Sequence, residues 1–310
     1  MPRTRSGLFR SQVIRRYKRR DPAVDEAIKN VFLRGVSTRQ AGSVLASLLD
    51  EAVSAATVST VAKVLDESVA KWHRRALSDH YPYLILDGVS VRLRLVGKVQ
   101  RRVVLCVYGI TKEGKGELID FLLQKSESQE SWKSLLEELW KRGLRGAALK
   151  LIVTDGNVAL VRALSEVWPR AAHQRCWVHK LRNLQSRLKA SQRLCLQEAK
   201  LIYQAQSQRE AIARFRKWKS RWQRSAPRAV HCLEADLEEL FSIFLLPPVQ
   251  RRRLRTTNVI ERLFVEVRRR IRTMCAFSTR DSCERILYSV FYRMNQYWAK
   301  HPLKPFTQNS

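Results

Sequence analysis

The pattern of apolar and polar positions changes character twice along the chain. The middle part begins with short β-prone runs separated by turn residues, at 83–87, 89–96, 103–110 and 118–123, which is typical of an antiparallel meander. The pattern then predicts a helix, a buried strand, a second helix and a short strand, at 131–140, 149–155, 158–167 and 171–178. This order favours an α/β fold, a mixed sheet with flanking helices.

Helical patterns flank this region on both sides. Before it, the sequence predicts helices at 22–33, 39–49 and 58–65, with a turn at 35–38 between the first two. Two short helices joined by a tight turn fit an N-terminal helix-turn-helix, although an ordinary three-helix packing element explains the spacing equally well. After it, residues 180–248 have a wholly helical pattern, and two closing helices follow at 261–272 and 282–298.

These changes divide the chain into five expected parts. They are a basic arm at 1–20, a helix-turn-helix DNA-binding domain at 21–78, a catalytic core formed by 79–180 and 250–300, an all-helical insertion domain at 181–249, and a tail at 301–310. The arginine-rich arm also resembles an organellar transit peptide, but it leads directly into patterned sequence, which favours an arm that contacts phosphates.

The net charge of the chain limits the kinds of partner that the protein is expected to bind. The chain carries 59 Lys and Arg against 28 Asp and Glu, a formal net charge of +31, which attracts nucleic acid or an anionic membrane surface. No apolar run approaches the roughly 18 to 20 residues that cross a bilayer. The six cysteines are scattered without the spacing of a disulfide scaffold. We therefore expect a protein with reduced thiols and no membrane partner, located in the cytoplasm and associated with the nucleoid.

Two acids follow buried runs. Asp87 comes after 84–86 and Asp155 after 151–154, and each precedes a glycine. Taken singly, an Asp-Gly pair after an apolar run is more often a turn. If the two strands are adjacent and parallel, however, both carboxylates lie at the same edge of the sheet, where open α/β sheets hold their ligands.

A third acid, Glu261, lies in the first of the closing helices. Asn258 three residues upstream offers a simple alternative, because the pair resembles a helix-capping box. At about 100° per residue the apolar side chains of this helix form one stripe, which leaves Glu261 at its edge with Arg268 and Arg272 below. A carboxylate in that position can border a cleft.

Gathered carboxylates in a strongly basic protein indicate metal-dependent chemistry on nucleic-acid phosphates. Two Mg²⁺ ions about 3.5 to 4 Å apart can activate an attacking oxygen and stabilise a leaving oxygen. Because Mg²⁺ keeps waters and accepts phosphate oxygens, three protein carboxylates can suffice.

Five segments resemble the Mutator-type transposases of bacterial insertion sequences. They are GVSTRQ (35–40), YPYLILDG (81–88), IVTDG (152–156), CWVHKLRN (176–183) and TTNVIERLFVEVRRRIR (256–272). That family has a ribonuclease-H-like core and an Asp-Asp-Glu triad. The resemblance implies that Asp87, Asp155 and Glu261 are catalytic and hold two Mg²⁺ ions, for which Mn²⁺ can substitute, and that 181–249 is the insertion domain of the group.

The resemblance also implies roles outside the triad. Cys176 and His179 match a Cys-x-x-His motif, for which we predict a structural or substrate-positioning role, since two ligands do not make a tetrahedral zinc site. Basic and polar side chains near the third acid are expected to bind DNA, although a solvated helix face explains any single arginine. These are Arg251, Arg252, Arg253, Arg255, Asn258, Arg268, Arg269 and Arg272.

The function expected from these features is DNA strand cleavage and strand transfer at the terminal inverted repeats of an insertion sequence, into target DNA, by a homodimer or higher homo-oligomer. Members of the family have a longer N-terminal region, so we expect a shortened copy that lacks some DNA-end recognition elements. Two alternatives remain: a decayed or co-opted transposase that acts as a DNA-binding repressor, and a ribonuclease-H-like nuclease without strand transfer.

Overall fold

The computed structural model describes residues 25–27, 30–31, 55–95, 97–272 and 276–303. They form two compact units, one of the described residues up to Lys71 with Asp281–Arg293, the other of Trp72–Arg280 with the described residues from Met294 onward. The predicted basic arm, most of the helix-turn-helix and most of the tail lie outside the described residues. The five-part division of the chain stays a prediction.

The first unit contains a helical pair and part of the last helix. Its elements are α3 (Ala55–Ala62), the start of α4 (Leu65–Arg74) and part of α14 (Arg280–Lys300). The single helix predicted at 58–65 is wrong, because the chain turns between α3 and α4 and Val64 is 61% exposed. Arg285 donates to both carboxylate oxygens of Asp66, at 2.7 and 2.9 Å, and so ties α14 to α4 within this unit.

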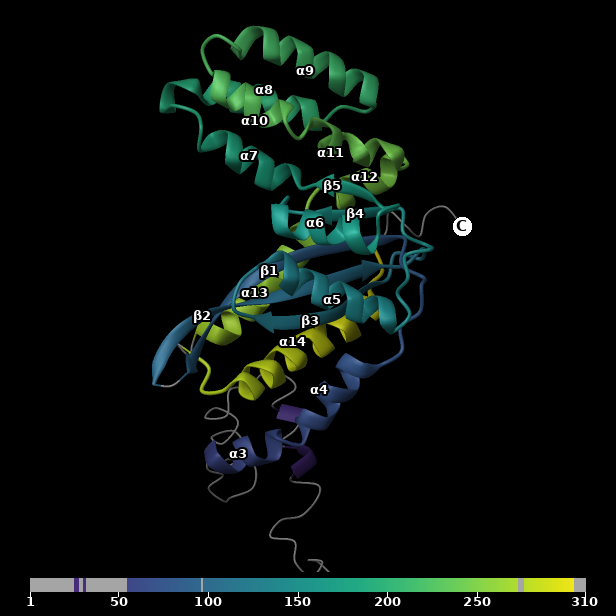
Figure 1. The fold of residues 1–310 in the computed structure, drawn as a ribbon, viewed down its shortest axis with the longest axis vertical. Coiled ribbons are helices and arrows are strands. Elements are labelled where there is room, and N and C mark those ends of the chain that lie inside the picture. Colours follow the sequence, from purple (N-terminus) through teal and green to yellow (C-terminus); the bar gives the residue numbers. More distant parts are fainter. Residues whose placement is uncertain (1–24, 28–29, 32–54, 96, 273–275, 304–310) are drawn as a thin grey trace, which may run out of the picture. The chain divides into compact units, whose positions relative to one another are not determined.

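The second unit is built on a five-stranded mixed sheet in the order β3-β2-β1-β4-β5 (Figure 1). The strands are β1 (Tyr83–Leu95), β2 (Lys98–Ile110), β3 (Gly116–Gln124), β4 (Leu151–Thr154) and β5 (Ala172–Arg175). Strands β1, β2 and β3 pair antiparallel, and β4 and β5 run parallel to β1. The predicted α/β class with a mixed sheet is confirmed.

Two predicted strand boundaries are wrong. The runs at 83–87 and 89–96 are one continuous strand, since Gly88 pairs with Leu105 and does not break β1. Its outer half alternates buried and exposed side chains, which is typical of a half-buried strand, and it joins β2 at a turn where Gly97 has a φ of 75°. The run at 171–178 is a strand only to Arg175, because Trp177 begins a helix.

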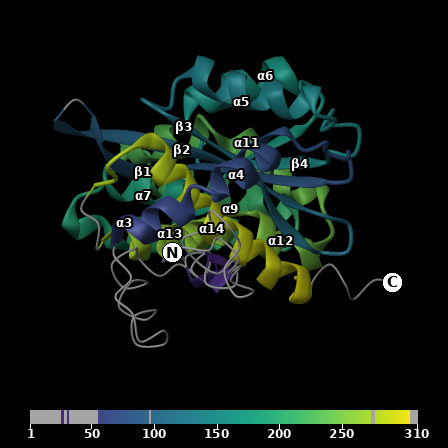
Figure 2. The same ribbon diagram turned by 90° about the horizontal axis from the view of Figure 1, so that it is seen from below.

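Helices cover both faces of the sheet. On one face, α5 (Gln129–Lys141) and α6 (Val158–Val167) bury their apolar sides against Leu84, Leu86 and Ile152. The opposite face receives α13 (Asn258–Arg272), which contacts β1 (Figure 2). Because side chains alternate along a strand, Ile85 and Asp87 point to the α13 face. The apolar core between the sheet and α5 and α6 therefore holds the strands in place. The candidate site lies on the opposite face, which α13 covers.

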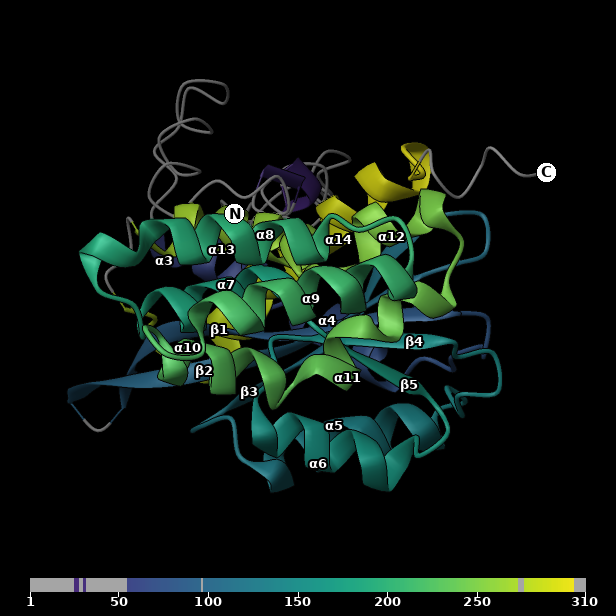
Figure 3. The same ribbon diagram turned by 90° about the horizontal axis from the view of Figure 1, so that it is seen from above.

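After β5, the chain is helical up to the third acid, with short turns between the helices. This part comprises α7 (Trp177–Gln185), α8 (Arg193–Tyr203), α9 (Gln208–Trp222), α10 (Pro227–Glu234) and α11 (Leu237–Phe241), with 3₁₀ turns at Ala190–Gln192 and Ser242–Leu245. These helices pack together (Figure 3), and they share a core of their own that includes Trp177, Phe215 and Trp218. A further helix, α12 (Pro248–Leu254), leads back to α13.

None of the helices in the described part of the chain combines the length and the apolar character needed to cross a bilayer. The five cysteines that lie among the described residues are all buried and free of disulfides.

Candidate active site

Strand register brings the first two predicted acids together. β1 and β4 pair in parallel with Tyr83 opposite Leu151 and Ile85 opposite Val153. The same offset, continued for two residues, sets Asp87 level with Asp155, just beyond the end of β4. The two acids are therefore neighbours, as expected, but Asp87 lies within the continuous strand β1 and not at a strand end.

This position is electrostatically unfavourable for the charged form of Asp87. Burial raises the pKa of its carboxyl, the charge of Asp155 raises it further, and the result is a pKa of about 7. One oxygen accepts the backbone N–H of Gly88 at 2.8 Å, which partly offsets the rise. The contacts that the protein supplies therefore do not fully stabilise the charged form of the Asp87 carboxyl.

Asp155 sits in the turn that links β4 to α6. Gly156 supplies a φ of 89°, where an added Cβ would meet the Arg175 guanidinium at 2.6 Å. The Asp155 carboxylate accepts the N–H of Asn157 at 2.8 Å, and Asn157 in turn caps α6 by accepting the N–H of Ala159 at 2.9 Å. These local bonds fix the turn. Arg175 is already paired with two acids of the insertion helices.

A fourth acid, Glu127, lies beside the two aspartates and was missed in the sequence. It precedes α5, and its carboxylate accepts the side-chain N–H of Asn157 at 2.9 Å. Burial raises the pKa of Glu127, and the charge of Asp155 raises it further. The only local signal is the polar stretch between strand and helix, which does not reveal that its acid reaches Gly88 and the Asp155 turn.

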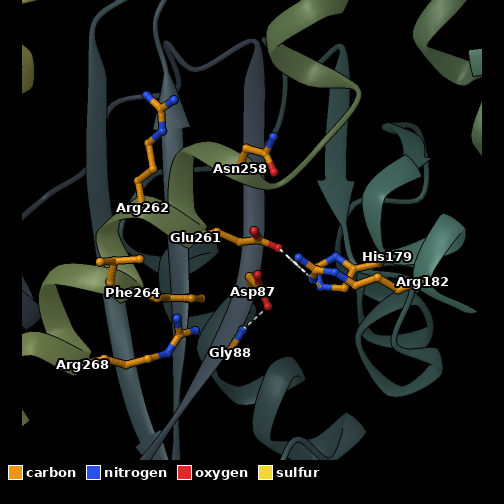
Figure 4. Close-up of a pocket in the computed structure, with 10 residues that line it drawn as sticks. Asp87, Gly88, His179, Arg182, Asn258, Glu261, Arg262, Phe264 and Arg268 are labelled. Carbon is orange, nitrogen blue, oxygen red and sulfur yellow. Dashed lines mark hydrogen bonds and ion pairs between the residues drawn. The ribbon is translucent and has the colours of Figure 1, made fainter. Parts of the chain in front are cut away.

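Glu261 reaches the same region from α13. It lines a pocket of about 490 Å³ together with Asp87, Gly88, His179 and Arg182, and Figure 4 shows the carboxyl groups of Asp87 and Glu261 in that pocket. Asp155 is not among the lining residues. The structure thus brings Asp87 and Glu261 into one pocket, and Asp155 lies next to Asp87 but does not line that pocket.

The Glu261 carboxylate is held by α7. Its Oε1 lies 3.5 Å from Nε2 of His179 and 3.5 Å from a guanidinium nitrogen of Arg182 (Figure 4). Among the contacts of the described residues, none joins this carboxylate to the backbone near Asn258, as a capping box requires. Asn258 itself is exposed and lines the pocket.

Cys176 and His179 connect α7 to the start of α13. Thr257 donates its backbone N–H and its hydroxyl to Sγ of Cys176, at 3.4 and 3.5 Å. Burial raises the pKa of the Cys176 thiol, but hydrogen bonds from His179 and Thr257 outweigh burial and leave it lowered. The hydrogen bond to Cys176 raises the pKa of His179. This contact anchors Thr257 one turn before Glu261 and so favours a structural or positioning role for the pair.

The predicted DNA-binding arginines divide into two groups. Arg251 and Arg255 are engaged inside the molecule, since Arg251 donates to the carbonyl of Leu246 at 2.7 Å and Arg255 to that of Tyr203 at 2.8 Å. The others are exposed: Arg252, Arg253, Arg268, Arg269 and Arg272. Arg268 lines the pocket, and Arg269 pairs with Glu266 on its own helix at 2.8 Å. DNA contact remains a prediction for the whole set.

The carboxylates of this site are suited to a cation that prefers oxygen ligands. In the described part of the chain, no Lys or Arg side chain forms an ion pair with Asp87, Asp155 or Glu127. Carboxylate oxygens are the ligands that Mg²⁺ and Mn²⁺ prefer. As they stand, no three His, Cys, Asp or Glu side chains among the described residues are close enough to share one ion. An ion shared by Asp87, Asp155 and Glu261 would therefore require Glu261 to turn from α7 toward the aspartates.

Comparison with known proteins gives consistent results over the chain. The sequence model of the family described as Transposase, Mutator family, matches residues 1–301. The chain is 34% identical to the transposase for insertion sequence element ISRM5 of Rhizobium meliloti (strain 1021), over 97% of this chain and 75% of that protein. It is 32% identical to the transposase for IS256 in transposon Tn4001 of Staphylococcus aureus, over 96% of this chain and 77% of that protein.

Replacing Gly88 by Ala tests the position of Glu127. An added Cβ would lie 1.7 Å from Oε1 of Glu127, so the carboxylate must move and its bond to Asn157 is disturbed. Gly88→Ala should therefore lower the free energy of unfolding by about 0.5 to 1.5 kcal/mol. Glu127→Ala in the same chain should restore part of that loss, with a coupling of at least about 0.5 kcal/mol in urea denaturation.

Gly116→Ala is the matched control for this cycle, because its Cβ would meet the Tyr108 hydroxyl at 1.7 Å instead. Glu127→Ala should not relieve that clash. Strict additivity of Gly88→Ala and Glu127→Ala would place the Glu127 carboxylate elsewhere.

The raised pKa of Asp87 predicts a pH-dependent stability. In the metal-free protein its folded pKa is about 7, against an ordinary value of 3.8. The protonated form is therefore favoured by folding, and this contribution is present below about pH 4 and is lost as the pH rises toward 7. Asp87→Asn should become more stable relative to wild type over that window, by at most about 1.4 kcal/mol per pH unit.

Urea denaturation in a chelator between pH 4.5 and 8 measures the difference. Glu138→Gln, on the exposed side of α5, controls for the loss of a carboxylate elsewhere. A constant difference between Asp87→Asn and wild type would contradict the electrostatic account of the site.

Proposed function

Because the chain belongs to the Mutator family of transposases, we propose that it is an Asp-Asp-Glu transposase that cleaves and transfers DNA strands at the terminal inverted repeats of an insertion sequence. One observation carries the chemistry. Asp87, Asp155 and Glu127 gather without an ion-paired Lys or Arg among the described residues, beside the pocket of Glu261, in a chain of net charge +31. Carboxylates left in that state favour bound divalent cations.

The fold supports the same proposal. In the five-stranded mixed sheet, the three acids come from the central strand β1, from the end of its parallel neighbour β4 and from α13 on the face of the sheet opposite α5 and α6. We take this arrangement as a ribonuclease-H-like core, interrupted by the helices α7 to α11 and preceded by a helix-turn-helix.

Two Mg²⁺ ions, or Mn²⁺ in their place, are the proposed cofactors. Bound there, they would activate the attacking oxygen and stabilise the leaving oxygen of a phosphodiester. Asp87 would contribute to both ions because it lies level with Asp155 and shares a pocket with Glu261. Glu127 adds negative charge at the side of Asp155 and holds Asn157, which fixes the turn.

The α7 residues position the third acid. His179 and Arg182 hold Glu261 in the pocket, and the bond between Cys176 and Thr257 fixes the start of the helix that carries it. When Glu261 turns to a cation, the Arg182 guanidinium, already 57% exposed, becomes free to bind a phosphate oxygen. Arg182 thus lies where a substrate strand would meet the acids.

The proposed partner is double-stranded DNA, both element ends and target. Exposed arginines on α12 and α13, of which Arg268 lines the pocket, would contact phosphates: Arg252, Arg253, Arg268, Arg269 and Arg272. Strand transfer that joins two ends needs more than one active site, so we propose a homodimer or higher oligomer on DNA, associated with the nucleoid in the cytoplasm.

A second candidate is a non-catalytic transposase that represses by occupying element ends. One observation favours it: Glu261 is paired with Arg182 and His179, and no three potential ligands among the described residues share an ion site as they stand. Such a protein would bind DNA with steep salt dependence and would never cut it.

Glu261→Gln separates these functions. The amide keeps the shape of the side chain but removes the charge that a cation needs, so strand cleavage in Mg²⁺ should fall by roughly 100-fold or more. DNA binding should persist, and the free energy of unfolding should stay within about 0.5 kcal/mol of wild type. The assay uses a labelled element end, a target duplex and Mg²⁺.

Glu266→Gln is the matched control, since this acid is on the same helix but does not line the pocket. A Glu261→Gln variant that cuts normally would remove the acid from the mechanism, and one that unfolds would return it to a capping role. Wild-type protein that binds ends without cutting supports the repressor, and cutting without joining supports a plain nuclease.

A further inference from the structure

Helix α9 of the insertion presents two kinds of basic side chain. Three of them are paired with acids: Arg214 with Glu210 at 2.5 Å, Lys219 with Glu234, and Arg221 with Glu198 at 2.5 Å. Three others on α9, Arg209, Arg216 and Lys217, are exposed and, among the described residues, form no ion pair and no side-chain hydrogen bond; the same holds for Arg224, which lies in the turn after the end of the helix. The acids of the insertion thus neutralise one set of cations and leave the other.

Three of these four cations lie on one face of the helix. At about 100° per residue, Arg209, Arg216 and Lys217 fall within an arc of about 100°, and the paired residues fall outside it. Two short side chains, Ala213 and Ser220, are exposed on the same face. We call these three cations, with Arg224 in the turn that follows α9, the α9 stripe. On the helix its cations extend over roughly 12 Å.

The α9 stripe faces away from the core of the insertion helices because the opposite side of α9 is buried in that core. Ala211, Phe215 and Trp218 belong to the core of the insertion helices, and the indole N–H of Trp218 donates to the carbonyl of Cys195 at 2.9 Å. Figure 1 shows α9 on the side of the insertion away from the sheet, with α7 nearer to β5. The cations therefore face outward from a rigid support.

We propose that the α9 stripe is a DNA-binding surface that contacts the phosphates of a duplex outside the pocket. This proposal rests on the proposed function and deepens it. A row of cations spread along a helix, with short residues between them, matches the regular phosphates of a duplex and lets the backbone approach closely. It provides position and affinity without reading sequence.

Other occupants fit less well. A helix that lies on a membrane needs an exposed apolar face beside its basic one, and the apolar side of α9 is used in the core of the insertion. The insertion, 181–249, carries thirteen Lys and Arg against six Asp and Glu, so the field around the stripe is positive over a wide area. Such a field suits a long polyanion better than a small acidic patch.

The test compares two triple variants of equal charge. The stripe triple is Arg216→Gln, Lys217→Gln and Arg224→Gln, and the control triple is Arg214→Gln, Lys219→Gln and Arg221→Gln. Both remove three positive charges from the same stretch of chain, so the net charge of the protein falls equally. Only the first removes cations that no acid neutralises. Circular dichroism and thermal unfolding check that both variants fold.

Binding is measured on the full chain as a function of salt, with a labelled duplex that carries an element end and with an unrelated duplex of equal length. The stripe triple should reduce the slope of log K against log salt by about 2 to 3, since each lost phosphate contact contributes about 0.9. The control triple should change it by less than about 1. A loss on one duplex alone supports the proposal and identifies whether end or target DNA is bound.

Equal slopes for both triples would overturn the proposal, because only total charge would then matter. An unchanged stripe triple would overturn it as well, as would a stripe triple that loses binding to anionic phosphatidylserine vesicles but not to DNA. Cleavage by the wild-type protein is measured in parallel. If wild type cleaves and the slopes are unchanged, the stripe fails alone; if wild type never cleaves, the proposed catalytic function fails, and the slopes still decide the stripe.

Discussion

The parallel pairing of β1 with β4 is the constraint on which the site depends. A fixed offset sets Asp87 level with Asp155, and the sheet cannot form in this register without placing two carboxylates together. The cost is visible in the raised pKa of Asp87, to which burial and Asp155 both contribute. The chain has a large excess of Lys and Arg, so one of these side chains could have neutralised the two carboxylates. Among the described residues no Lys or Arg pairs with Asp87 or Asp155, and this is the observation on which the proposed cation site rests.

The third acid depends on a different kind of contact. The Cys176 thiol accepts two hydrogen bonds from Thr257, and α7 then reaches Glu261 through His179 and Arg182. The insertion therefore starts with the helix that holds the third acid. This connection supports the predicted structural or positioning role of the Cys-x-x-His motif, because both of its side chains contact Thr257 at the start of α13.

The sequence predicts those features that local patterns determine. Asp87 and Asp155 follow apolar runs that predict strands, and Glu261 lies in a helix pattern, whereas the parallel pairing of the two strands is shown only by the structure. The reach of Glu127 to Gly88 could not be predicted, because it depends on how the loop before α5 folds over β1. Nor does a run of arginines reveal that Arg251 and Arg255 donate to backbone carbonyls. The prediction of two separate strands at 83–87 and 89–96 was wrong. A glycine often interrupts a strand, but Gly88 stays within β1 and leaves space for the Glu127 carboxylate.

Binding of Mn²⁺, followed by anomalous diffraction from crystals of the protein with an element-end duplex, tests the central claim most directly. The account predicts two manganese peaks at Asp87, one shared with Asp155 and one with Glu261, and a Glu261 carboxylate that has left Arg182. Peaks that do not touch Asp87, or a Glu261 still paired with Arg182 while the ions are bound, would contradict it.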